Sequence, residues 1–259
     1  ACHSVRIVLL PIQLKKIMTS TLTGPAIVAA QGILAESSTA QASVGSYMET
    51  ADGRGFRYTK VGATATVAGK VYQSKALDAT NDQPSGGHAV AAAAINDTAV
   101  VTTATLTVTA NEFQGGYLAV VVTPGEGYTY KIASHAAASA AVVTMNLEDP
   151  IKVALTTASR VIWCANPYNG VVIEPGTPTG RIVGVAPTII TAAYYGWLQT
   201  KGVASVLFTG TGAAGKVVGS LTGGTSGSMA PAIAATNIGG EHMATGITGE
   251  YSLIYLRID

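Results

Sequence analysis

A glycine-rich segment, Gly210-Thr211-Gly212-Ala213-Ala214-Gly215-Lys216, has the spacing of two phosphate-binding motifs. In such motifs the glycines precede a helix whose first amide groups face the phosphate, and a Ser or Thr after the Lys binds magnesium. Val217 stands at that position, and the residues after it have the character of another strand and turn. The sequence therefore predicts a glycine-rich β-turn here, and no nucleotide or other cofactor.

The other residue types that do chemistry are scattered along the chain. None of the histidines has a second His or Cys at the spacing of a zinc site, so we interpret all four as solvated loop residues and expect no metal. Glu148 and Asp149 are adjacent, so in a strand they point apart and form no acid–base pair. No G-x-S-x-G nucleophile elbow occurs. We expect no catalytic residues and no enzyme; a hydrolase assembled only in space is the alternative. The histidines are His3, His88, His135 and His242.

The 259-residue chain carries few charges. Charged residues make up 11% of the sequence, against about 25% in an ordinary soluble domain. Fifteen basic and fourteen acidic side chains give a net charge of +1, which lacks the dense basic surface that a nucleic-acid partner requires. No stretch approaches the ~20 consecutive apolar residues that span a membrane. This composition is typical of a chain that works in an assembly, with neither nucleic acid nor membrane as a partner.

Short runs with a period of two residues dominate the chain from about residue 51 onward. They are rich in Val, Thr and Tyr and are separated by Gly, Pro, Asn and Asp, as at 56–61, 66–73 and 102–110. This pattern predicts an all-β protein of sandwich-like or barrel-like domains with few short helices, one of them a single turn at 191–193.

The domain organisation follows from changes in this pattern. Residues 1–50 have mixed signals and predict an extended N-terminal arm. Residues 51–165 predict a β-rich domain, within which 88–163 are a candidate inserted β-domain, and 166–259 predict a C-terminal β-domain. Three prolines (Pro175, Pro178, Pro187) follow the boundary at 165/166 and favour a polyproline-like connector there.

Two groups of residues are candidate interface positions. The arm has apolar side chains but no partner within itself, so it must bury them against the body of the chain or a neighbour. A Tyr- and Trp-containing segment follows near residue 195, where an interface or inter-domain contact and an ordinary core are alternatives, and sugar stacking is less favoured. The arm positions are Ile7, Leu10, Leu14 and Ile17, and the aromatic positions are Tyr194, Tyr195 and Trp197.

The last predicted strand, 251–258, is apolar on both faces. One face carries Ser252, Ile254, Leu256 and Ile258, and the other carries Tyr251, Leu253, Tyr255 and Arg257. A strand with two apolar faces is expected to be covered on both sides.

Two stretches carry a resemblance to a known family. In TADGRGFRYTKVGATATVAGKVYQ an Ala-Asp-Gly-Arg turn leads into aromatic strands, and YYGWLQTKGVASVLFTGTGAAGKVVGSLTGGTSGSMA and GEYSLIYLRID hold a Tyr-Gly-Trp strand, glycine-rich turns and a closing strand. In these features the chain resembles the head decoration (cement) proteins of tailed bacteriophages. Residues 88–163 match the pattern less well, and residues 1–17 lie outside it.

The resemblance implies a β-rich accessory protein on the outer surface of a virion. Such a protein is expected to bind the major capsid protein, to assemble with itself as a homotrimer, and to hold neighbouring capsid subunits together. No catalytic residues come with the resemblance. A phage tail or fibre module for host recognition or carbohydrate binding is the alternative, because exposed Tyr residues and Gly-rich loops also suit that role.

Overall fold

The computed structural model describes residues 31–77, 84–103, 107–139, 142–220, 223–232 and 237–259. Regular structure within these residues consists of strands alone, which confirms the all-β prediction. The predicted helical turn at 191–193 is wrong, and no other short helix occurs in the described part of the chain. Ala193 has a φ of 63°, in the left-handed region, which a right-handed helix excludes.

Five strands close into a barrel. They follow one another in the order β2-β12-β3-β13-β14, and β14 then pairs with β2 to complete the circle. Closure leaves these strands without free edges. Their bounds are β2 (Gly55–Val61), β3 (Val71–Gln73), β12 (Asn169–Ile173), β13 (Ile182–Val185) and β14 (Tyr195–Leu207).

The same sheet continues beyond the barrel because β14 is 13 residues long. Its first half pairs with β2, and its second half pairs with the last strand of the chain, β18. The change comes at a register irregularity between Gln199 and Lys201, followed by Gly202 with a φ of +82°. The added strands are β1 (Tyr47–Glu49), β15 (Val217–Ser220), β16 (Ala230–Pro231), β17 (Asn237–His242) and β18 (Tyr251–Arg257).

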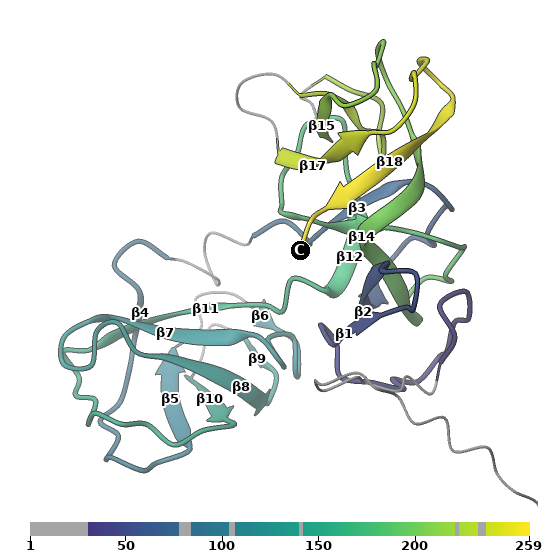
Figure 1. The fold of residues 1–259 in the computed structure, drawn as a ribbon. Helices are drawn as coiled ribbons and strands as arrows, with labels where there is room; N and C mark the ends of the chain where they lie inside the picture. The colour runs from purple at the N-terminus through teal and green to yellow at the C-terminus, as the bar shows by residue number, and fades with distance from the viewer. Residues whose placement is uncertain (1–30, 78–83, 104–106, 140–141, 221–222, 233–236) are drawn as a thin grey trace, which may run out of the picture.

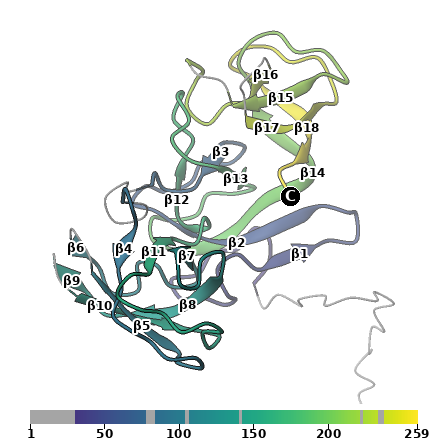
Figure 2. The same cartoon turned by 90° about the vertical axis from the view of Figure 1, so that its left-hand side faces the viewer.

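A second unit is formed by a six-stranded sheet in the order β4-β11-β7-β8-β10-β5. A bridge between Val90 and Thr102 joins its two sides, so the sheet is nearly closed around a core that includes Trp163 and Phe113. In both views this unit and the β15–β18 strands lie at opposite ends of the barrel (Figure 1, Figure 2). The strands are β4 (His88–Ala89), β5 (Ala99–Thr103), β6 (Thr107–Val108), β7 (Tyr117–Val122), β8 (Thr129–His135), β9 (Ala138–Ser139), β10 (Val142–Leu147) and β11 (Arg160–Cys164), of which β6 and β9 pair separately.

The strands of the predicted unit 51–165 are divided between the two sheets. Strands β2 and β3 pair with strands that follow residue 166, whereas all six strands of the second sheet lie within 88–164. The predicted polyproline-like connector is wrong, because β12 and β13 occupy much of it. Its three prolines lie outside the strands, where a residue without an amide hydrogen costs no ladder bond.

The first described residues pack on the barrel. Gln31 is buried, and its carbonyl accepts a hydrogen bond from the indole of Trp197 at 3.1 Å. Ser37 forms a bridge with Tyr195 at the start of β14. The predicted arm positions lie outside the described residues; they are Ile7, Leu10, Leu14 and Ile17.

The described histidines are buried, so the interpretation as solvated loop residues is wrong for His88, His135 and His242. The His88 ring stacks on Trp163 at 3.7 Å, and the His135 Nε2 accepts a hydrogen bond from the backbone amide of Phe113 at 2.9 Å. Ring stacking thus accounts for the burial of His88, and the hydrogen bond to the Phe113 amide accounts for that of His135. The part of the chain that the structure describes holds no group of three or more His, Cys, Asp or Glu residues that could bind a metal.

Candidate interaction surface

Strand β18 presents an apolar face to solvent. Its side chains alternate, so that Ile254 and Leu256 enter the core while Tyr251, Leu253 and Tyr255 remain 50%, 49% and 38% exposed. The sequence predicts cover on both faces of this strand. Within the described residues the chain covers only one of them.

Neighbouring strands extend this surface. Val203 of β14 lies opposite Tyr255, and Met243 donates its backbone amide to the carbonyl of Leu253 at 3.0 Å. Residues that face one another across antiparallel strands share a side of the sheet. We call the resulting surface the outer face; it consists of Val203, Val217, Met243, Tyr251, Leu253 and Tyr255, all of them at least 38% exposed.

One ion pair interrupts the outer face. Arg257 contacts Glu241 at 3.0 Å, and its guanidinium carbon lies 5.9 Å from the centre of the Tyr255 ring. Both charged side chains are well exposed, so the pair adds little to stability. An exposed apolar surface of this kind marks a site of association more often than a site of chemistry.

A groove adjoins the outer face beside the second half of β14. Its volume is about 620 Å³, and apolar side chains from five separate parts of the chain line it. Leu34 and Ile189 are 64% and 65% exposed there. We call it the apolar groove; its apolar lining includes Leu34, Val67, Pro187, Ile189, Val203 and Tyr251.

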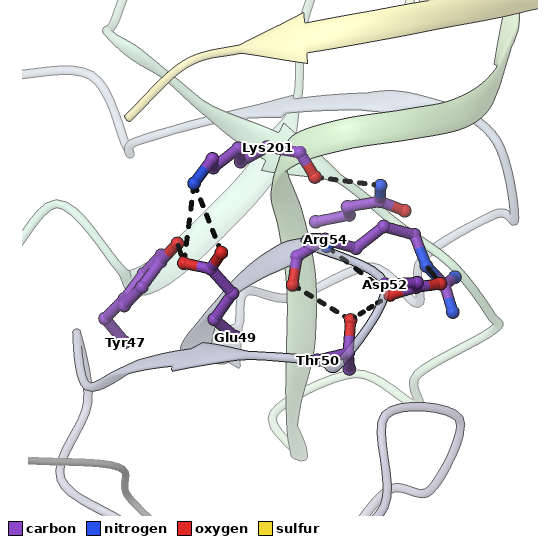
Figure 3. A network of polar contacts seen from close by, with 7 residues as sticks. Tyr47, Glu49, Thr50, Asp52, Arg54 and Lys201 are labelled. Carbon is purple, nitrogen blue, oxygen red and sulfur yellow. Dashed lines mark hydrogen bonds and ion pairs between the residues drawn. The ribbon is translucent and has the colours of Figure 1, made fainter. Parts of the chain in front are cut away.

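A polar network fixes the β1–β2 hairpin to β14 beside this groove (Figure 3). The Tyr47 hydroxyl donates to Glu49 at 2.8 Å, and the Lys201 ammonium lies 3.3 Å from the same carboxylate. Burial, and then the hydrogen bond to Glu49, raise the pKa of Tyr47 to about 12. The hydrogen bonds from Tyr47 and Lys201 lower the pKa of Glu49. The carboxylate therefore stays ionised and holds both donors.

The tip of the same hairpin is closed by a second set of contacts, also drawn in Figure 3. The Thr50 hydroxyl and the Arg54 guanidinium, the latter at 2.7 Å, donate to Asp52 and lower the pKa of its carboxyl. A Cβ at Gly202 would lie 3.0 Å from the Arg54 side chain, so the hairpin tip sits directly on the bend of β14. Gln199 spans that bend by donating to the carbonyl of Val203 at 2.8 Å. These contacts position the start of the outer face.

The aromatic residues predicted as interface positions lie elsewhere. Trp197 is fully buried and meets the Tyr58 ring edge-on at 4.9 Å, so it belongs to the core and offers no surface to a partner. Tyr194 is half-buried against a neighbouring core cluster. Tyr195 is also half-buried and stacks on Tyr58 at 6.1 Å.

A polar cleft of about 580 Å³ lies between the barrel and the second sheet, with Tyr195 in its wall. The Lys60 ammonium lies 5.7 Å from the centre of the Tyr195 ring, whose other contact is the stack on Tyr58. The ring is thus engaged within the chain and is poorly placed to stack on a sugar. Glu148, also in this wall, forms an ion pair with Lys131 at 2.9 Å.

The phosphate-motif segment forms a turn. Strand β15 follows it directly, Gly212 bridges to Gly246, and Gly210 and Gly215 have φ values of 99° and 77°. The glycines therefore serve backbone turns, and no helix N-terminus is present in this segment to hold a phosphate.

The sequence predicts the apolar face of strand 251–258, but it does not predict the apolar groove. The alternation along 251–258 signals a second apolar face, but Val67 and Ile189 have no local signal that they meet in one groove.

No helix within the described ranges is long and apolar enough to span a bilayer. No protein-family model, no curated protein and no solved structure matches this chain.

Proposed function

We propose that this chain is a structural protein of a bacteriophage virion that binds the outer surface of the head and cements contacts between major capsid subunits. The observation that carries the proposal is the outer face, which is apolar, exposed and built on the paired strands β14 and β18. The resemblance of the sequence to head decoration proteins supports the same role.

The energetics of such a surface suit a cement. Burial of a Leu or Tyr side chain stabilises an interface by about 1.5–3 kcal/mol. Because a head offers many equivalent sites, and one oligomer engages several subunits at once, modest contacts add through effective concentration. The outer face itself consists of aliphatic, Met and Tyr side chains, with the Arg257–Glu241 pair and Lys201 beside it, so few charges lose water when it is covered.

A charge placed in the outer face is expected to weaken capsid binding. Leu253→Asp puts an ionised carboxylate where a partner would bury an apolar side chain, and we expect at least about a tenfold loss of affinity for heads that lack the protein. Cosedimentation of the purified full-length chain with such heads measures this, and the melting temperature of the decorated heads measures the cementing effect.

Ile95→Asp is the matched control. Ile95 is 56% exposed, close to the 49% of Leu253, but lies in a turn of the second unit. Wild-type binding by the Leu253→Asp protein, or heads that gain no thermal resistance from the wild-type chain, would argue against the proposal. Labelling confined to the tail tip would instead favour the host-recognition alternative.

We also propose that the chain assembles as a homotrimer. Sedimentation equilibrium, or binding to heads followed by counting of subunits per site, is expected to give three times the 26.2 kDa chain mass. A chain that sediments as a monomer and occupies the head singly would contradict the trimer while leaving capsid binding intact.

A further inference from the structure

The apolar groove is a hollow in the surface of the described chain. It is continuous with the outer face through Val203 and Tyr251, yet it is concave, and its volume of about 620 Å³ lies in the range of sites that hold a short peptide or small ligand. Leu34, Val67 and Ile189 project into water at 43–65% exposure. Three such side chains around one hollow favour an apolar occupant.

The described chain begins beside this groove. Gln31 is fixed to the barrel, because its side-chain amide donates to the carbonyl of Tyr195 at 3.1 Å and its Oε1 accepts from the Tyr58 hydroxyl at 2.8 Å. Leu34, only three residues later, is already part of the groove wall. The thirty residues that precede Gln31 therefore join the molecule close to the groove.

The sequence of those residues complements the groove. Residues 5–17, VRIVLLPIQLKKI, are mostly large aliphatic side chains. Residues 1–30 contain three basic residues (Arg6, Lys15, Lys16) and no acidic one, which leaves twelve of the fifteen basic and all fourteen acidic residues in the rest of the chain. The segment and the rest of the chain thus carry opposite net charge, which favours their association; Arg54, the charged side chain in the groove lining, is paired with Asp52.

We propose that the apolar groove binds the N-terminal segment of this chain, residues 5–17. The fourteen residues from Ile17 to Gln31 reach up to about 50 Å when extended, so the connection permits it. Docking covers Leu34, Val67 and Ile189 and buries the aliphatic side chains of the segment together with them. The groove shares Val203 and Tyr251 with the outer face, but docking of the segment does not depend on capsid binding.

Limited trypsin digestion of the full-length chain tests the proposal, because the segment contains three cleavage sites. Ile189→Asp places a charge in the groove and is expected to raise the initial rate of cleavage after Lys15 and Lys16 at least about tenfold, since cleavage requires the undocked segment. Mass spectrometry of the released N-terminal fragments gives the rate. Leu10→Asp, in the segment itself, is expected to have the same effect.

Ile238→Asp is the matched control, because Ile238 is 63% exposed against 65% for Ile189 but lies on β17 and does not line the groove. Its cleavage rate is expected to equal that of the wild type, and circular dichroism confirms that each variant is folded. Equal rates in the Ile189→Asp and wild-type chains would overturn the proposal. If cleavage is unchanged while Ile189→Asp lowers the oligomer mass or the affinity for heads, the occupant is a second copy or a capsid subunit, and the proposal is equally overturned.

Discussion

Replacing Trp197 by alanine is expected to lower the free energy of unfolding by about 3–5 kcal/mol, the cost of truncating a buried Trp. The side chain is fully buried, packs edge-on against Tyr58, and donates its indole N–H to the carbonyl of Gln31. Its removal leaves a large cavity between β14 and the residues that pack over it, Ile33 and Ala42 among them, and an acceptor without its donor. Urea denaturation followed by far-ultraviolet circular dichroism measures the change.

Trp197→Phe separates the two contributions. It keeps an aromatic ring against Tyr58 but deletes the hydrogen bond to Gln31, and we expect a loss of about 1–3 kcal/mol, the cost of an unmade buried bond together with a smaller ring. Suppose instead that the Trp197→Ala chain unfolds at the same urea concentration as the wild type but no longer forms an oligomer. Trp197 would then be an interface residue, and its assignment to the core would be wrong.

A Glu174→Gln chain is expected to be more stable than the wild type above pH 7 by about 3 kcal/mol. Glu174 follows β12, is 1% exposed, and its Oε1 has no hydrogen-bond partner among the described residues. Burial raises the pKa of this carboxyl from 4.5 to about 7, against a smaller lowering by the Gly227 amide. The folded chain therefore holds a proton that the unfolded chain releases.

The sign of the pH dependence follows from this difference. The contribution of Glu174 to stability is fully present below pH 4.5 and is lost as the pH rises through about 7, because the unfolded state then gains from ionisation and the folded state does not. Glu49, Asp52 and Glu112 have lowered pKa values and act in the opposite sense at lower pH. Subtracting the Glu174→Gln curve from that of the wild type isolates Glu174. A difference that is flat between pH 4.5 and 8 would disprove a buried acid at this position.

The structural consequence of ionisation is local. The backbone carbonyl of Glu174 accepts hydrogen bonds from the Gly227 amide at 2.8 Å and the Ser226 hydroxyl at 2.9 Å, and the Gly227 carbonyl accepts from the amide of Val71. The segment around Gly227 thus covers the carboxyl. The protection factor of the Gly227 amide against hydrogen exchange is expected to fall above pH 7 in the wild type and to stay unchanged in Glu174→Gln.

The class of the fold follows from local pattern, whereas its topology does not. Runs with a period of two fix which residues face inward, and the alternation along 251–258 appears as buried and exposed positions of β18. The pairing of β2 with β12 and β14 joins segments more than a hundred residues apart, and no local property of either segment specifies it. For the same reason the sequence does not predict β12 and β13, which lie in a segment rich in proline and glycine and are paired with distant strands.

The candidate surface was predictable only where one strand carries it. A second apolar face on 251–258 is visible in the sequence, but its exposure depends on whether another layer covers it. Trp197 shows the converse: an aromatic residue suits a core and an interface equally, and only its neighbours, Tyr58 and Gln31, distinguish them. The groove depends on Leu34, Val67 and Ile189 meeting in space, which no spacing rule encodes.

The place where the second sheet joins the barrel has a consequence for how this molecule can be altered. Gln73, the last residue of β3, is paired with Val172 of the adjacent antiparallel strand β12, so the chain leaves the barrel at the end of one strand and returns at the start of its neighbour, Asn169. The whole outlying unit thus occupies the position of a hairpin loop. Recombination can lengthen it, exchange it or graft a foreign domain there while the host scaffold keeps its register.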